Sequence, residues 1–268
     1  MRALLKVGFS LLVLAFVLIG LSYGMLRANG VTAKAEGRQV SSETREIAGS
    51  VSAVELEGPI NLSVRYGAAP AMKVRGESRL LNNIDVSNDG STLHIGIRGM
   101  VLSHRHPLEV ELVLPRLESI TIDGSGASTV NGFSGERIDV RMEGRGSLRF
   151  NGRFQEVDAA LSGNGELDLN AGASIERFEA VLTGSGHMTI VGSVKELHAN
   201  ASGSGELDAR HLRADKVEVS QTGSGRSTVQ ARQTLSASIS GSGDVEVTGN
   251  PAERSVSRTG SGAVTFSD

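Results

Sequence analysis

The chain has 268 residues, with 34 glycines, 7 phenylalanines, 2 tyrosines, no tryptophan and no cysteine. The absence of cysteine excludes disulfide scaffolds, thiolate zinc sites and cysteine nucleophiles. The formal net charge is −3 and no long basic run is present, which argues against nucleic acid as a partner. Glycine is nearly twice as frequent as in average proteins but lacks the every-third-residue period of collagen.

The first residues have the layout of an export signal or a membrane anchor. Arg2 and Lys6 precede an apolar run over residues 7–26, whose 20 residues could span a bilayer as a helix. An Ala-Lys-Ala sequence at 33–35 matches a signal-peptidase site, but it lies well past the apolar run. We therefore predict that residues 1–35 are either an uncleaved anchor or a cleaved signal peptide. Both alternatives export everything that follows.

Residues 46–115 show short alternating apolar runs separated by turn residues, a pattern typical of strands. Ile60, Leu62 and Val64 alternate in this way with polar neighbours. The sequence Asn-Asp-Gly at 88–90 separates two such runs and is a β-hairpin signal. No stretch shows a convincing helical period. We therefore expect strands throughout this segment, which would form the N-terminal part of a larger β domain.

A Gly-x-Gly triplet recurs eight times over residues 116–268. Six triplets read Gly-Ser-Gly, and Arg145 and Asn164 take the middle position in the other two. Successive triplets are 18 to 21 residues apart, and a steady period of this length indicates a repeat architecture. The triplets lie at 124–126, 144–146, 163–165, 184–186, 203–205, 223–225, 241–243 and 260–262.

Apolar residues lie two and four positions from most triplets, with polar or charged residues between them. Ile120 and Ile122 precede the first triplet, and Leu148 and Phe150 follow the second. Apolar and polar residues thus alternate on both sides of a tight turn. This alternation predicts two short strands per repeat, each with one buried face. A second turn is expected about six residues after each triplet, for example at Asn151-Gly152.

One such repeat cannot bury its apolar face alone, whereas stacked repeats form a continuous core. We therefore predict an all-β fold, a β-solenoid or parallel β-helix of about eight rungs, where a rung is one winding of about 20 residues. The strand-rich segment and an N-terminal apolar helix would precede it. The last rung is expected to be an atypical cap, because Arg258 occupies a position that is apolar in other repeats.

With these features, the chain resembles the bacterial family called putative auto-transporter adhesin, head GIN domain, over roughly residues 46–266. The matching features are the repeats centred on Gly-Ser-Gly and the preceding stretch VSAVELEGPINLSVRYG…LPRLESITIDGSG. The resemblance implies a pectin-lyase-like superhelix in which Gly-Ser-Gly makes the turn between two sheets. It also implies an exported protein with a role in cell adhesion. A homo-oligomer is compatible with this role, although no heptad coiled coil is present.

No catalytic, cofactor or metal motif is found. None of the triplets extends to Gly-x-Gly-x-x-Gly, and no Walker, His-Glu-x-x-His or Gly-x-Ser-x-Gly sequence occurs. His104 and His106 lie in an expected loop without a nearby carboxylate, and we interpret all six histidines as solvated side chains. We therefore predict no catalytic, cofactor-binding or metal residue, no cofactor and no enzymatic activity.

An acidic pattern after three of the triplets raises the question of calcium. The acidic pairs are Glu166 and Asp168, Glu206 and Asp208, and Asp244 and Glu246. With one repeat per rung, neutral or basic pairs lie between them, about 4.8 Å away, and the charges compensate each other. With two repeats per rung, the carboxylates would stack and would need a cation such as calcium. We expect the first register, with one repeat per rung, because charge compensation between rungs then explains why acidic pairs alternate with neutral or basic ones.

Together these observations predict an exported, adhesin-like interaction module of the cell envelope. It would lie in the periplasm or at the cell surface, anchored by residues 7–26 if these are not cleaved, and bind a glycan or protein ligand of unknown identity. The alternative is a polysaccharide-cleaving enzyme, since pectin-lyase-like folds include such enzymes. That activity would need a cluster of carboxylates, or carboxylates with Lys or Arg, on one strand face.

Overall fold

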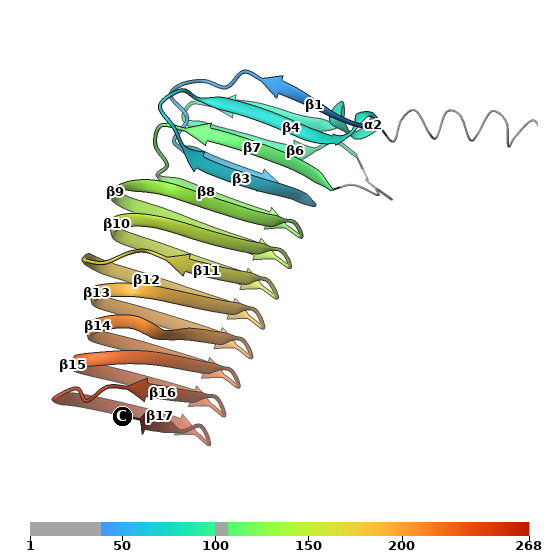
Figure 1. Cartoon of the computed structure of the whole chain (residues 1–268). Helices are drawn as coiled ribbons and strands as arrows, with labels where there is room; N and C mark the ends of the chain where they lie inside the picture. The colour runs from blue at the N-terminus through green and yellow to red at the C-terminus, as the bar shows by residue number, and fades with distance from the viewer. Residues whose placement is uncertain (1–38, 100–106, 268) are drawn as a thin grey trace, which may run out of the picture.

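The computed structural model describes residues 39–99 and 107–267, and it shows an all-β chain wound into a solenoid (Figure 1). The rungs stack in one direction down to the C-terminus, and several additional strands cover the opposite end. The predicted export segment over 1–35 lies outside the described residues. Within those residues, no helix has the length and apolar character needed to cross a membrane.

Each rung has one strand on each of two opposite sheets, which we call face A and face B. Face A consists of β2 (Ala53–Glu57), β8 (Ser119–Gly124), β12 (Ile175–Gly184), β17 (Glu253–Gly260) and the second halves of the long strands β9 (Ala127–Gly144), β10 (Ser147–Gly163), β13 (His187–Gly203), β14 (Glu206–Gly223) and β15 (Arg226–Gly241). Face B consists of β3 (Ile60–Tyr66), β11 (Glu166–Asn170), β16 (Asp244–Thr248), β18 (Val264–Ser267) and the first halves of the long strands. The chain passes from face A to face B through the Gly-x-Gly triplets.

Parallel pairing stacks each triplet on the next one. Gly124 lies opposite Gly144, and Gly203 lies opposite Gly223. The chain therefore completes one rung per repeat, which confirms the expected register. The solenoid has about seven full windings rather than eight, because a winding is completed only between one triplet and the next.

Glycine is required at both outer positions of the triplet. Gly203 has a φ of +116°, and a Cβ atom there would lie 2.3 Å from the carbonyl oxygen of Gly184 in the preceding rung. A Cβ atom on Gly205 would lie 2.6 Å from the carbonyl oxygen of Gly186. A side chain at either position would collide with backbone held in the stack. Ser204, the middle residue, is exposed.

The expected second turn is a bend within a strand in most repeats. The strands β9, β10, β13, β14 and β15 run from one triplet to the next without interruption. The turn predicted at Asn151-Gly152 is an irregularity in the pairing of β10 with β9. The sequence thus located the corner but not its form, because a strand can bend at such an irregularity and keep its neighbours.

The core is a narrow column of mostly aliphatic side chains between the two faces. Ile120, Ile122 and Leu148, all predicted to point inward, are at most 1% exposed. Phe150 and Phe178 are the largest fully buried side chains. Small inward residues such as alanine let the two faces approach each other, which accounts for the scarcity of aromatic residues.

The last rung departs from this pattern, as expected for a terminal repeat. Val256 is 47% exposed and Phe266 is 41% exposed, because no further described strand stacks on β17 and β18. The guanidinium of Arg254 lies 4.5 Å from the centroid of the Phe266 ring. Arg258 is also exposed, and its Nη1 atom donates a weak hydrogen bond to the carbonyl oxygen of Gly262 at 3.4 Å.

The segment before the first triplet adds strand pairs to the solenoid in an order that differs from the chain order. β2 and β3 pair in parallel with β8 and β9, and the corner at Gly58 lies directly against the first triplet. On their other side, β6 (Thr92–Ile97) and β7 (Leu108–Leu114) pair in parallel with β2 and β3. The chain therefore builds an inner pair, then the outer pair, and then returns at β8.

Antiparallel strands and a short helix complete the N-terminal end. β4 (Ala71–Glu77) pairs with β7, β1 (Val40–Arg45) pairs with β4, and β5 (Ile84–Asp89) forms the predicted hairpin with β6. The helix α2 (Ser78–Leu81) corrects the expectation of strands throughout 46–115. Leu80 and Leu81 are buried in it, but four residues are too few to show a helical period in the sequence.

Replacing Gly203 by valine should destabilise the solenoid. A side chain at a positive φ costs about 1–2 kcal/mol, and the contact with the carbonyl oxygen of Gly184 adds to this cost. Because rungs contact only their neighbours, the loss of amide hydrogen-exchange protection should centre on the rungs next to Gly203.

The matched control is Ser204→Ala, at the exposed position between the two glycines. It should change the free energy of unfolding by less than about 0.5 kcal/mol. If the Gly203→Val variant were as stable as this control in a denaturant titration, the close stacking of the triplets would be wrong.

Candidate interaction surfaces

Charged side chains of alternating sign form a row along the outer side of face A. In-register pairing places these residues on successive rungs, so each cation has an anion beside it. The row consists of Arg137, Glu156, Arg177, Glu196 and Lys216.

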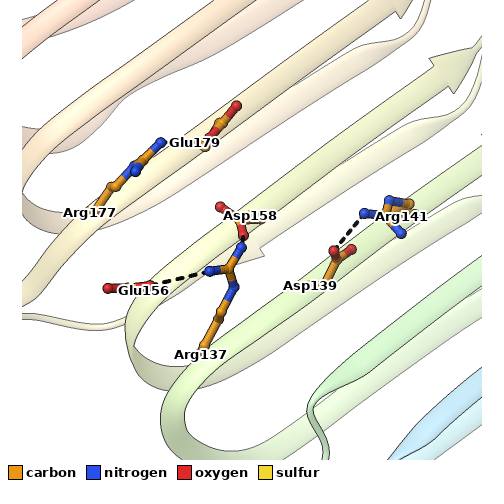
Figure 2. Close-up of polar contacts among 7 residues, drawn as sticks. All are labelled: Arg137, Asp139, Arg141, Glu156, Asp158, Arg177 and Glu179. Atoms are coloured by element: carbon orange, nitrogen blue, oxygen red, sulfur yellow. Dashed lines mark hydrogen bonds and ion pairs between the residues drawn. The ribbon is translucent and has the colours of Figure 1, made fainter.

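Four members of this row form ion pairs with a neighbouring member, whereas Arg177 pairs with Glu179 on its own strand. The Nη1 atom of Arg137 lies 3.6 Å from Oε2 of Glu156 (Figure 2). The Nζ atom of Lys216 lies 3.0 Å from Oε1 of Glu196, and this contact lowers the pKa of Glu196 below its ordinary value. The side chains are exposed, so solvent screens each pair and its contribution to stability is small. Because each charge has a partner, this row has little charge left to attract a ligand.

A second row on face A places three carboxylates next to each other, an arrangement that no pattern in the sequence predicts. Asp139, Asp158 and Glu179 occupy equivalent positions on consecutive rungs. An arginine compensates each of them: Arg137 donates to Asp158, Arg141 lies 2.7 Å from Asp139, and Arg177 lies 2.9 Å from Glu179. Figure 2 shows these side chains interleaved on adjacent strands.

Among these three carboxylates, Asp139 has a perturbed protonation equilibrium. Its partial burial raises its pKa above the ordinary aspartate value. The positive charge of Arg141 opposes this shift, and the negative charge of Asp158 adds to it. A carboxyl group with a raised pKa beside a second carboxylate has the composition of an acid–base pair. It is therefore the feature that an enzymatic alternative must rely on.

On face B, the expected alternation of charge is confirmed. The register places Ser147, Glu166, His187, Glu206, Arg226 and Asp244 on successive rungs. The Nη2 atom of Arg149 lies 3.2 Å from Oδ2 of Asp168 on the next rung. The acidic pairs are thus separated by neutral or basic rungs. Within residues 39–99 and 107–267, no cluster of three or more His, Asp or Glu side chains has a geometry that could hold a metal ion.

Three histidines lie on the outer sides of strands, each beside a glutamate. The Nδ1 atom of His94 lies 2.9 Å from Glu55, that of His198 lies 3.1 Å from Glu218, and that of His187 lies 3.5 Å from Glu206. His211 is exposed. These positions agree with the interpretation of solvated histidines, whereas His104 and His106 lie outside the described residues.

The raised pKa of Asp139 gives a prediction with a definite sign. A carboxylate that is harder to ionise in the folded state lowers stability at neutral pH, and this penalty disappears as the pH falls through the folded-state pKa. Asp139→Asn should therefore be slightly more stable than the parent at pH 7, by less than about 1 kcal/mol because solvent screens the site. Melting curves should show this difference shrinking as the pH is lowered towards the ordinary aspartate pKa of 3.8.

Glu196→Gln provides a control of opposite sign. The pKa of Glu196 is lowered, so its contribution to stability is present above the ordinary glutamate pKa and is lost as the pH falls. This variant should be slightly less stable than the parent near neutral pH. The explanation given for Asp139 would be contradicted if both variants shifted the melting temperature in the same direction.

The alternation on face B predicts that calcium does not stabilise the parent protein. Millimolar calcium should leave its melting temperature unchanged, whereas Arg226→Glu should create a calcium response. That substitution brings a carboxylate between Glu206 and Asp244, and stacked carboxylates repel each other unless a cation lies between them. A large upward shift in the parent, reversed by a chelator, would contradict the charge-compensated arrangement.

Three solved structures with a similar fold are two putative adhesins and one putative lipid binding protein. A putative adhesin from Bacteroides fragilis is 19% identical, with a TM-score of 0.68, and the match covers 87% of this chain and 99% of that one. A putative lipid binding protein from Parabacteroides distasonis is 22% identical with a TM-score of 0.80, covering 86% and 97%. A putative adhesin from Parabacteroides merdae is 17% identical with a TM-score of 0.80, also covering 86% and 97%. At these identities, the likeness shows the fold alone.

No curated protein matches the chain. A family model matches residues 51–251, which includes the strand pairs before the first triplet and nearly all of the repeats. The matched span contains seven of the eight triplets and the strands that stack between them. The chain belongs to the family described as putative auto-transporter adhesin, head GIN domain.

Proposed function

We propose that the protein is a non-enzymatic, adhesin-like interaction module, exported to the cell envelope and tethered or released there. The observation that carries this proposal is the long outer surface of the solenoid, on which polar side chains recur at every rung. A rigid rod of this kind can make many weak contacts along an extended partner, and such contacts add up through multivalency. Its ligand would be a glycan or a protein of the envelope or of a neighbouring surface.

Two further observations support this proposal. The family and two of the similar structures described above carry the description of adhesins. In addition, the ionised side chains in the two rows of face A are paired with each other. A general acid or base must reach the substrate proton that it transfers, and pairing with arginine or lysine argues against that role for these side chains.

The test of this proposal is a deletion of the gene followed by complementation with the full chain. We expect the deletion to reduce surface attachment or aggregation, and the parent and the Ser204→Ala variant to restore it. The Gly203→Val variant, with its damaged solenoid, should restore it less well. Unchanged attachment, aggregation and envelope integrity in the deletion strain would contradict the adhesive role.

The alternative of a polysaccharide-cleaving enzyme is favoured by one observation, the row of Asp139, Asp158 and Glu179. The raised pKa of Asp139 would suit a general acid, and neighbouring carboxylates are the usual pair of a glycoside hydrolase. Against this stands the arginine that neutralises each carboxylate. Incubation of the protein with uronic-acid polysaccharides should therefore yield no new reducing ends and no unsaturated products. Products that disappear in the Asp139→Asn variant would establish the enzyme instead.

A further inference from the structure

The row of triplets departs from Gly-Ser-Gly at two consecutive rungs. The outer glycines are fixed by close contact between rungs, but the middle residue is exposed and no such contact restricts it. Serine fills this position in six of the eight triplets. Arg145 and Asn164 take the other two positions and lie on neighbouring rungs. The turn itself requires neither side chain, so another property must account for them.

Both side chains line one groove, which has a volume of about 440 Å³. The lining also includes Ser125 and Ser185, the middle residues of the triplets on the rungs to either side, and Glu166 and His187 at the start of face B strands. The glycines at the third position of these four triplets also form part of the lining. The groove is shallow and open to solvent, and it follows the axis of the rod over four rungs, a form that suits an extended ligand.

The groove holds opposite charges that are not neutralised by the fold. Arg145 and Glu166 are exposed, and neither forms an ion pair or a side-chain hydrogen bond with another residue of the described part of the chain. On the neighbouring rows, by contrast, Arg149 is paired with Asp168 and Arg137 with Asp158. The groove therefore contains a cation and an anion that remain available to a ligand.

The amide of Asn164 is oriented by its neighbour. The hydroxyl of Ser185 donates a hydrogen bond of 2.8 Å to Oδ1 of Asn164. This contact fixes the side-chain oxygen on the Ser185 side, and the two N–H donors of the amide are left for another partner. The arrangement thus combines a guanidinium, an amide donor, hydroxyls and a carboxylate along one groove.

We propose that this groove binds an acidic oligosaccharide, with a sugar carboxylate on Arg145 and ring hydroxyls on Asn164 and Glu166. Guanidinium groups recognise carboxylates through two parallel hydrogen bonds, and carboxylate side chains accept hydrogen bonds from hydroxyls. A free anion such as phosphate would use Arg145 but would be repelled by Glu166. A ligand that carries both an anionic group and neutral hydroxyls satisfies both residues. This inference rests on the proposed function and specifies the ligand class of the adhesive surface.

The test uses the full chain and isothermal titration with a trimer of galacturonic acid, with a neutral glucose trimer and inorganic phosphate as comparison ligands. The uronate trimer should bind at least about tenfold more tightly than either of these, and its affinity should fall as salt is added. The double variant Arg145→Ser/Asn164→Ser should lose at least about tenfold in affinity. It replaces both residues by the serine that the chain carries in its other triplets, so its melting temperature should stay near that of the parent.

A matched control is Ser224→Ala, in a triplet outside the groove, which should keep the affinity of the parent. Equal binding by the double variant and the parent, or no binding of the uronate trimer by the parent, would overturn the proposal. Attachment assays in the deletion strain show whether only the groove proposal fails or whether the proposed adhesive function fails as well. If the double variant restores attachment fully in the deletion strain, the adhesive role stands without this groove; if the deletion itself has no effect, the adhesive role fails.

Discussion

The structure depends on the direct contact between glycine backbones of successive rungs. At each triplet, a side chain would collide with the carbonyl group of the triplet before it, as at Gly203 against Gly184. This contact fixes the spacing and the register of the rungs at one corner, and the parallel strands on both faces continue that register. Positions that are equivalent in the repeat therefore become neighbours in space. The physical consequence is that every outer row behaves as a ladder of adjacent side chains.

Such ladders restrict which charges the outer faces can carry. Equal charges on consecutive rungs lie one strand spacing apart, so they must alternate with opposite charges or be compensated locally. The row of Arg137, Glu156 and Arg177 alternates, whereas the row of Asp139, Asp158 and Glu179 is compensated by arginines. In the row of middle residues of the triplets, the neighbours of Arg145 are the neutral Ser125 and Asn164. It is at this position that the chain carries an unpaired charge beside a groove, which is why we assign a ligand to it.

The sequence predicts most of this architecture, because a stacked repeat expresses its three-dimensional contacts as a local period. The spacing of the glycines, the inward residues such as Ile120 and Leu148, and the alternation on face B all follow from that period. The order of the first strand pairs could not be predicted, since β2 and β3 lie between pairs that are not their neighbours in the chain. The carboxylate row was missed because its members lie well before the triplets, where outward positions show no constant residue type. The groove at Arg145 was also missed, although the two departures from Gly-Ser-Gly are visible in the sequence.

The one-repeat-per-rung register can be measured directly, because the chain has no cysteine of its own. Ser204, Ser224 and Ser242 are the exposed middle residues of three consecutive triplets. Cysteines at 204 and 224 lie on adjacent rungs at about the 4.8 Å strand spacing, within the range that a disulfide can bridge, whereas 204 and 242 lie two rungs apart. Mild oxidation should therefore link the Ser204→Cys/Ser224→Cys pair within one chain and leave the Ser204→Cys/Ser242→Cys pair unlinked. The reverse result would show that two repeats form one rung and would contradict the stacking of the glycines.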